Sequence, residues 1–227
     1  MLYGALPRKV ELGAFDAALK AARTLPPQIF EILSAVKSAH PMDALRTAVS
    51  ALAAFDPDTT DNSREATLAK GTRLISQIPL AVAAHAHIRA GKSQVTANPT
   101  LSHAGNFLWM LDGKVPSADA AKLLDTDFVL HAEHGSNASS FAARVVIGTE
   151  ANLHAAITAA IATLSGPAHG GAAEDVMQMA SEIGSAKHVP EYVKANVPPR
   201  KPSPVSATAS TAPRTRAPGI CAPGSSG

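Results

Sequence analysis

The sequence predicts an all-α fold over residues 1–196, followed by a tail of a different kind. Three observations support this prediction. Apolar residues recur at helical spacing along most of the chain. Alanine and leucine are abundant, and no stretch shows the alternating β-branched pattern of a half-buried strand. Proline, serine, asparagine and glycine also stand where helices are expected to begin and end.

The first half of the chain is expected to hold helices separated by prolines and acidic turns. The prolines at residues 26–27 end one helix and restart the next, and Pro41 suits the first turn of another. Ser63 is a suitable N-cap for a long helix, which Pro79 should kink or break and Gly91 should end. In chain order, these helices are expected over residues 9–24, 27–36, 42–55 and 63–90.

The second half is expected to be helical as well. Ser117 and either Asn137 or Ser139 are suitable N-caps. The Ala-rich segment 152–164 is expected to be buried in a core or in a subunit interface, because its small side chains let helices approach closely. The expected helices cover residues 99–111, 117–131, 137–146, 152–164 and 172–185.

The last expected helix contains large apolar side chains that can be buried, whereas the tail contains few. Val176, Met179 and Ile183 should face inward, and Met177 is also interpreted as a core residue. Residues 197–227 consist mainly of Pro, Ser, Ala, Thr and Arg, with few large apolar side chains. Such a segment buries too little apolar surface to offset its ordering entropy, so we expect it to be disordered.

The bulk composition excludes several classes of protein. The chain has 227 residues, of which 46% are hydrophobic, which supports a sizeable core. Its net charge of +2 gives no reason to expect nucleic acid or an anionic membrane as a partner. No run is long enough for a transmembrane helix, and the N-terminus lacks a secretory signal. The single cysteine, Cys221, allows no intrachain disulfide, so a cytoplasmic location is expected.

The segment GPAHGGA at residues 166–172 is the most informative part of the sequence. It places His169 between glycine-bearing turns, directly before a helical run. Glycines let the backbone approach a ligand closely, and a helix N-terminus offers free N–H groups. An imidazole in this position can donate a hydrogen bond to a developing oxyanion. The alternative is a histidine on an ordinary turn between helices.

Four blocks of the sequence resemble blocks of citrate synthase of the bacterial type. Residues 40–52, which carry HPM and LRTAVSAL, resemble the family's HPM…LRTAVSAL block, and NFLWML at 106–111 resembles NFLYML. LHAEHGSNASSFAAR at 130–144 is similar to LHADHELNASTFAAR, and GPAHGGA at 166–172 is similar to GPLHGGAN. The order and spacing of the blocks agree, and the resemblance covers residues 1 to about 196.

The resemblance implies a function and two site residues. The family condenses acetyl-CoA with oxaloacetate to give citrate and CoA, at the entry to the tricarboxylic acid cycle. His169 is implied to be catalytic, because it would hydrogen-bond the thioester oxygen as the enol forms. His134 is implied to bind oxaloacetate. The resemblance calls for no metal and no cofactor, since acetyl-CoA is a substrate.

The resemblance also implies an architecture. Residues 1–170 would form most of the helical large domain, and residues 171–196 would begin the small domain. Family members are dimers, and the helices around residues 141–146 and 152–164 would fit the interface. In the family the active site lies between the two domains, and domain closure completes it.

Several residues near the implied site carry alternative interpretations. His131 is interpreted as structural, and Glu133 either orients an imidazole or has a solvated or capping role. Ala168 replaces a leucine of the family pattern, Ala173 replaces an asparagine, and residues 135–136 read Gly-Ser where Glu-Leu is common. The remaining histidines, interpreted as surface or packing residues, are His85, His87, His103, His154 and His188.

The sequence lacks blocks that the family's chemistry requires. No counterpart is found for the GFGHRVY block, which holds the second catalytic histidine, or for the catalytic aspartate and the substrate arginines. The opening residues resemble LLYGELP, a block that normally follows an N-terminal region in the family. Methyl deprotonation needs a carboxylate base and dicarboxylate binding favours arginines, so this 227-residue chain is expected to be inactive.

The tail itself suggests why those blocks are missing. Back-translated with GC-rich codons and read one base earlier, residues 205–223 give GFGHRVYSAPDPRARHLRA, which contains both the histidine block and the family's DPRA block. We therefore hypothesise a frameshift at or shortly before residues 198–204, which would make residues 197–227 an out-of-frame tail. Resequencing the DNA from the codon of residue 195 onward distinguishes a reading error from a genuine shift in the gene.

Two other functional interpretations stay open at this point. One is a related enzyme that uses propionyl-CoA, a 2-methylcitrate synthase. The other is a non-catalytic remnant that serves at most as a dimerising module.

Overall fold

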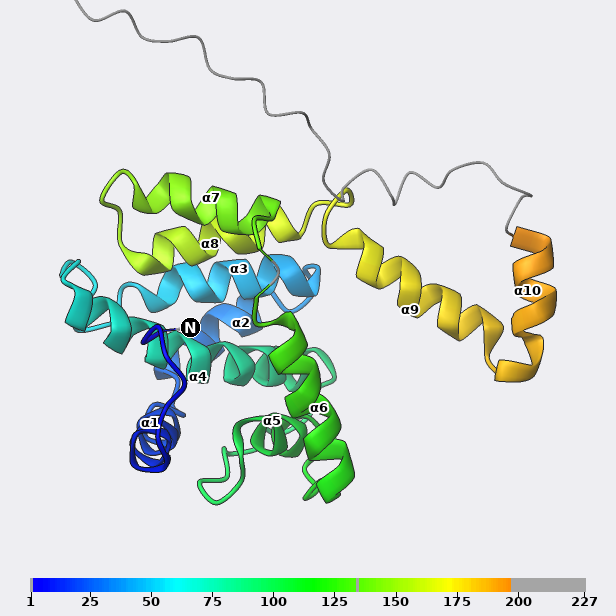
Figure 1. The fold of residues 1–227 in the computed structure, drawn as a ribbon, viewed down its shortest axis with the longest axis horizontal. Coiled ribbons are helices and arrows are strands. Elements are labelled where there is room, and N and C mark those ends of the chain that lie inside the picture. Colours follow the sequence, from blue (N-terminus) through cyan, green and yellow to red (C-terminus); the bar gives the residue numbers. More distant parts are fainter. Residues whose placement is uncertain (1, 134, 197–227) are drawn as a thin grey trace, which may run out of the picture. The chain divides into compact units, whose positions relative to one another are not determined.

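The computed structural model describes residues 2–133 and 135–196, without the side chains of residues 172–174. Within these ranges every regular element is helical, which confirms the all-α prediction (Figure 1). The chain divides into two compact units, Met1–Asp175 and Val176–Gly227. The tail at residues 197–227, for which the sequence predicts disorder, lies outside the described residues. No helix within the described ranges combines the length and apolarity of a membrane span.

The helices follow the predicted order. The first unit contains α1 (Lys9–Ala21), α2 (Pro27–Ala35), α3 (Pro41–Leu52), α4 (Arg64–Arg89), α5 (His103–Asp112), α6 (Ala118–His131), α7 (Ala138–Ile147) and α8 (Leu153–Leu164). Helix α9 (Gly171–Ile183) begins in the first unit and is followed by the 3-10 turn η1 (Ala186–His188) and by α10 (Val189–Asn196).

Side-chain caps define where several helices begin. Ser63, Ser117 and Asn152 precede α4, α6 and α8, and the side chain of each accepts a hydrogen bond from the backbone N–H three residues later. Asn137, rather than Ser139, is the N-cap of α7. The caps at Ser63 and Ser117 are ones that the sequence predicts, and each depends only on neighbouring residues.

Helix α4 continues through Pro79, so of the kink or break that the sequence predicts there, the break does not occur. An interior proline removes one backbone hydrogen bond and costs about 3 kcal/mol. The neighbours of α4 offset this cost, since α1, α2, α3, α5 and α8 all pack against it.

Val176, Met177 and Met179 are expected to be inward or core residues, but within the second unit this prediction is wrong. Their side chains are exposed by 56%, 67% and 40%, respectively. The described contacts of this part of α9 are polar, such as the hydrogen bond from the Tyr192 hydroxyl to Glu182 Oε2 at 3.1 Å. Ile183, near the end of α9, is half-buried. The short elements η1 and α10 are not among the helices that the sequence predicts.

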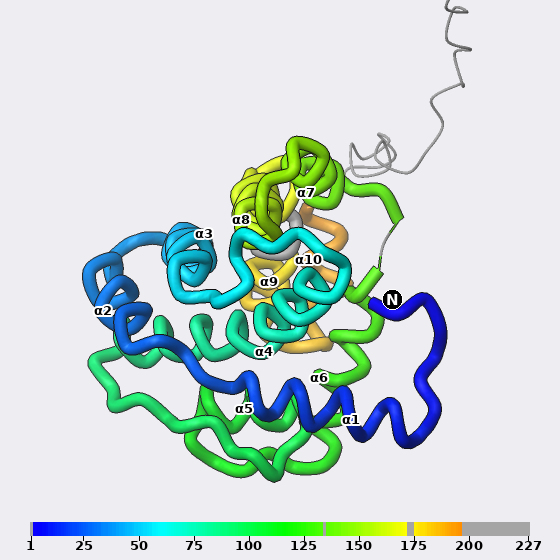
Figure 2. The backbone as a smooth tube through the Cα atoms, turned by 90° about the vertical axis from the view of Figure 1, so that its left-hand side faces the viewer, coloured from blue at the N-terminus to red at the C-terminus, as the bar shows by residue number. Residues whose placement is uncertain are grey.

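The core of the first unit lies between α2, α3, α4 and α8. Figure 2 shows α4 running beside α3 and α8, in agreement with their contacts. Alanines at the contact surfaces let these helices approach closely while Leu and Ile side chains fill the remaining space. The buried residues of this cluster are Ile29, Leu33, Ala44, Ala48, Val49, Leu52, Leu74, Ala81, Ala84 and Ile161.

A buried polar cluster ties the turn after α3 to α4 and α8. Arg73 donates from Nε and Nη2 to the Asp56 carboxylate at 2.7 Å each, and Nη2 also contacts Asp58 at 2.6 Å. The fully buried Lys70 donates from Nζ to the Asp61 carbonyl at 2.6 Å. His154 is fully buried as well, with Nε2 3.7 Å from Asp56 Oδ2.

Acid should destabilise the fold through this cluster. Burial lowers the pKa of His154, with Lys70 and Arg73 acting in the same sense and Asp56 against it. Burial alone would raise the pKa of Asp56, but hydrogen bonds and charge from Arg73 outweigh it and lower that pKa. At acidic pH, the unfolded chain therefore binds more protons than the folded chain does. Stability should decline as the pH falls below about 6.5 and decline further in the acid range where carboxylates titrate.

Urea unfolding between pH 7.5 and 5 measures this decline. His154→Gln should reduce the slope of unfolding free energy against pH by at most about 1.4 kcal/mol per pH unit, the contribution of one proton. An unchanged slope in H154Q would show that His154 does not contribute.

Candidate functional site

Helices α7 and α8 form an antiparallel hairpin. They are consecutive, they pack against each other, and α8 also packs on α3 (Figure 1). Because the two helices run in opposite directions, the first turn of α7 lies beside the last turn of α8. Residues that are distant in sequence therefore meet at this end of the hairpin.

A tight turn after α8 carries His169. The backbone N–H groups of His169 and Gly170 both donate to the Gly166 carbonyl, at 3.0 and 3.1 Å. Gly170 is required by close packing: a Cβ built on it would collide with the Leu164 carbonyl oxygen and lie 3.2 Å from the Leu164 carbonyl carbon. The glycine pattern thus reflects a backbone contact that fixes the position of His169.

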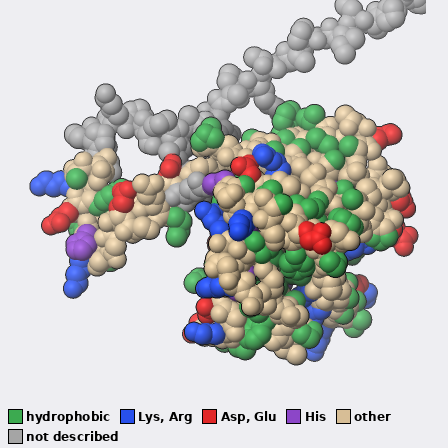
Figure 3. Space-filling view, turned by 180° about the vertical axis from the view of Figure 1, so that it is seen from behind, with side chains coloured by type: hydrophobic (Ala, Val, Ile, Leu, Met, Phe, Trp, Pro, Cys, Tyr) green, Lys and Arg blue, Asp and Glu red, His purple; other side chains and the backbone are tan. Residues whose placement is uncertain are grey.

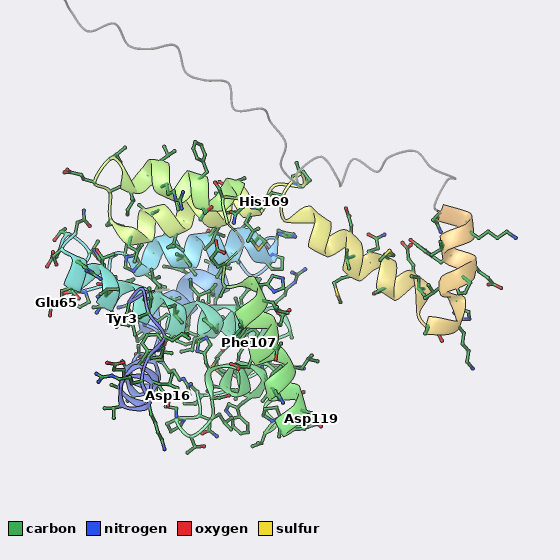
Figure 4. The ribbon with its side chains drawn as sticks, in the orientation of Figure 1. Tyr3, Asp16, Glu65, Phe107, Asp119 and His169 are labelled. Carbon is green, nitrogen blue, oxygen red and sulfur yellow. The ribbon has the colours of Figure 1, made fainter. Side chains whose placement is uncertain are left out.

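The His169 side chain meets Ser139 from the first turn of α7. Ser139 Oγ lies 2.6 Å from His169 Nε2, and both residues are half-buried. Figure 4 labels His169 at the end of α8, beside the start of α7. Since Nε2 is engaged by the hydroxyl, Nδ1 is the ring nitrogen left to meet a ligand. When the hydroxyl donates to Nε2, the neutral ring carries its proton on Nδ1.

From the sequence, Ser139 is expected only as a possible helix cap. No local signal distinguishes its hydroxyl from that of Ser140, which forms a capping box with Asn137. The contact with His169 depends on how the hairpin packs, so it becomes visible only in three dimensions.

His134, the second residue implied by the resemblance, lies outside the described residues. Its described neighbours form a turn. Glu133 Oε1 accepts a hydrogen bond from the Gly135 backbone N–H at 2.5 Å, and Gly135 has a φ of 69°, a conformation that favours glycine. The described contact of Glu133 is thus a local one, within the turn that its carboxylate stabilises.

The other histidines occupy several environments. His131 is exposed on the last turn of α6, with Nδ1 2.9 Å from the Asp127 carbonyl oxygen. His85, His87 and His154 are buried within α4 and α8, which agrees with packing roles. No group of three or more His, Cys, Asp or Glu side chains within residues 2–133 and 135–196 is arranged to hold a metal ion.

Replacing two adjacent glycines with alanine tests the turn geometry. Gly170→Ala should destabilise the first unit by more than about 2 kcal/mol, because the new methyl group would overlap backbone atoms that cannot move away. Gly171→Ala is the matched control. Its Cβ would lie 3.6 Å from Pro167 Cβ, an ordinary contact, so its effect should stay within about 0.5 kcal/mol. Urea unfolding of the three proteins measures the difference, and equal stability of the two variants would contradict the described turn.

Comparison with known proteins identifies the family. Residues 1–202 match the family model for the citrate synthase C-terminal domain. The citrate synthase of Deinococcus radiodurans is 43% identical over 194 residues, which cover 85% of this chain and 52% of that protein. The 2-methylcitrate synthase of Mycobacterium tuberculosis is 38% identical over 195 residues, which cover 86% of this chain and 49% of that protein.

A solved structure supports the same assignment. The crystal structure of citrate synthase from Pyrobaculum aerophilum matches with a TM-score of 0.80 and 36% identity, over 88% of this chain and 52% of that one. The chain thus spans about half the length of these relatives. From its sequence blocks, its helical fold and these matches, the chain belongs to the citrate synthase family.

Proposed function

We propose that this chain is the His169-bearing part of an enzyme that condenses acetyl-CoA with oxaloacetate to give citrate and CoA. The observation that carries the proposal is the contact between Ser139 Oγ and His169 Nε2. Two further facts support it: membership of the citrate synthase family, and the backbone contact that requires Gly170 beside His169.

The geometry suggests how His169 would act. The Ser139 hydroxyl donates to Nε2, which keeps the neutral imidazole protonated on Nδ1. That N–H would then donate to the thioester oxygen of acetyl-CoA as negative charge develops there during enolisation. Ser139 and the turn already hold the ring in position, so the ring needs little reorientation when the negative charge develops. Oxaloacetate is assigned to His134, and the base that removes the methyl proton is left unassigned.

A relative that uses propionyl-CoA is the second candidate. Ala168 stands beside His169 where the family pattern has leucine, and a smaller side chain leaves more room for an extra methyl group. The match to a 2-methylcitrate synthase from Mycobacterium tuberculosis supports this alternative. A pocket typically discriminates one methylene by about 1–3 kcal/mol, so a clear preference should be measurable.

The proposal includes an architecture and a location. We assign residues 1–170 to a large domain and residues 171–196 to the start of a small one. Figure 3 shows hydrophobic side chains on the surface. Those on α7 favour a homodimer, since Phe141 is 64% exposed and Val145 is 54% exposed. Sedimentation of the purified chain measures its oligomeric state. The single cysteine of the sequence is consistent with a cytoplasmic location.

Turnover of acetyl-CoA and propionyl-CoA with oxaloacetate tests these assignments. We expect the 227-residue polypeptide alone to release no CoA, because its sequence contains no GFGHRVY block. In a protein with that block restored in frame, His169→Ala should lower kcat by about 10²–10³-fold, the typical loss for one oxyanion donor. Ser139→Ala should lower kcat less, because it removes only the group that orients His169.

His131→Ala is the control variant and should keep wild-type turnover, since its ring contacts the end of its own helix. Turnover by the frame-restored H169A variant at the wild-type rate would contradict the role of His169. A higher kcat/KM for propionyl-CoA would favour the second candidate. Lack of activity with either thioester in the frame-restored protein would leave only the non-catalytic remnant.

A further inference from the structure

A cavity in the first unit lies apart from the His169 site, because none of the hairpin residues line it. Its volume is about 240 Å³, much more than the roughly 30 Å³ that one water molecule occupies in the liquid. The cavity lies between α4 and the irregular segment at residues 92–98. Most of its wall is apolar, and the side chains of Arg23 and His87 are the groups in it that carry or accept charge.

Arg23 is a buried cation with unused donors. Only 6% of the residue is exposed, and Nη1 donates to the backbone carbonyls of Asn98 and Leu101 at 2.8 and 3.0 Å. Its Nε and Nη2 atoms are buried and have no hydrogen-bond partner among the described residues. Unpaired buried donors on a charged group are costly, so native structures usually satisfy them.

No carboxylate of the described residues forms an ion pair with Arg23. Asp16 acts on it only at longer range and is itself paired with Lys20 at 2.7 Å. Burial is the main effect on Arg23 and lowers its pKa, while Asp16 acts in the opposite sense. The charge of Arg23 also adds to the effect of burial in lowering the pKa of His103. The positive charge of Arg23 is therefore not balanced by an ion pair with a described carboxylate.

His87 supplies an unused acceptor in the same cavity. It is 7% exposed, and Nε2 lies 2.8 Å from the Met110 carbonyl oxygen. A carbonyl only accepts hydrogen bonds, so Nε2 must carry the proton and donate it. In the neutral ring Nδ1 is then a bare acceptor, and this atom is buried without a partner.

We propose that this cavity binds a short hydroxycarboxylate. The two carboxylate oxygens would accept from Nε and Nη2 of Arg23, a planar bidentate pairing that suits a guanidinium edge. The hydroxyl group would donate to His87 Nδ1, and the carbon chain would contact the apolar wall formed by residues such as Phe30 and Leu80. One monoanion would satisfy all three unpaired nitrogen atoms and balance one buried charge.

The segment that covers the cavity is held in place. Trp109 Nε1 donates to the Thr96 carbonyl at 2.9 Å, and Asn106 Oδ1 accepts from the Asn98 backbone N–H at 2.7 Å. Gln94 adds a hydrogen bond to the Ala84 carbonyl at 3.3 Å. These anchors indicate a preformed site, which reduces the ordering cost of binding a small ligand.

Thermal unfolding of the 227-residue chain with added lactate or β-hydroxybutyrate tests the proposal, at constant ionic strength set with NaCl. A ligand that binds only the folded state raises Tm in a saturable way. We expect such a rise with at least one of these carboxylates and none with propylene glycol, which has hydroxyl groups but no charge. Arg23→Lys should weaken binding by about tenfold or more, because lysine lacks the bidentate edge.

Two further variants keep the test decisive if R23K does not fold. Ala83→Leu fills the cavity from a buried position on its wall and should abolish the rise in Tm, whereas Ala86→Leu, at an exposed position of α4, should retain it. His169→Ala should also retain it, which separates this site from the proposed condensation site. The proposal is overturned if neither carboxylate raises Tm beyond NaCl alone, or if A83L responds as wild type does.

Discussion

The packing of α8 against α3 is the contact on which the candidate site depends. Helix α8 contributes Ile161 to the buried core and carries the His169 turn at its C-terminal end. Alanines at positions 44 and 48 of α3 are fully buried, which lets the two helices approach closely. Once α8 is fixed in this way, α7 can pack only on its other side, and that placement brings Ser139 to His169.

The polar cluster around Asp56 supports the same arrangement from the opposite end of α8. His154, in the first turn of α8, faces Asp56, which Arg73 holds to α4. The turn between α7 and α8 is also held, since Asn62 Nδ2 donates to the Glu150 carbonyl at 2.7 Å. Glu150 has a φ of 64°, which costs a non-glycine residue of order 1 kcal/mol or more. The N-terminal end of α8 is thus restrained by contacts outside its own hairpin.

The sequence predicts local features of this fold well and long-range ones poorly. The caps at Ser63, Ser117 and Asn137 involve neighbouring residues, so the local sequence indicates them. The path of α4 through Pro79 and the exposure of Met177 depend on which elements surround a helix, and composition does not supply that information. Glycines around His169 mark its turn in the sequence. The contact of Ser139 and the unpaired nitrogens of Arg23 depend on how distant segments pack, which the sequence does not show.

The hairpin also has a consequence for the order of folding. Ser139 and His169 are 30 residues apart, and most of the chain between them is helix that forms through local contacts. Closing so short a loop costs little chain entropy, and contacts of low sequence separation form quickly. During synthesis, this half of the site can therefore assemble as soon as α8 and its turn have left the ribosome, before any later segment of the chain is available.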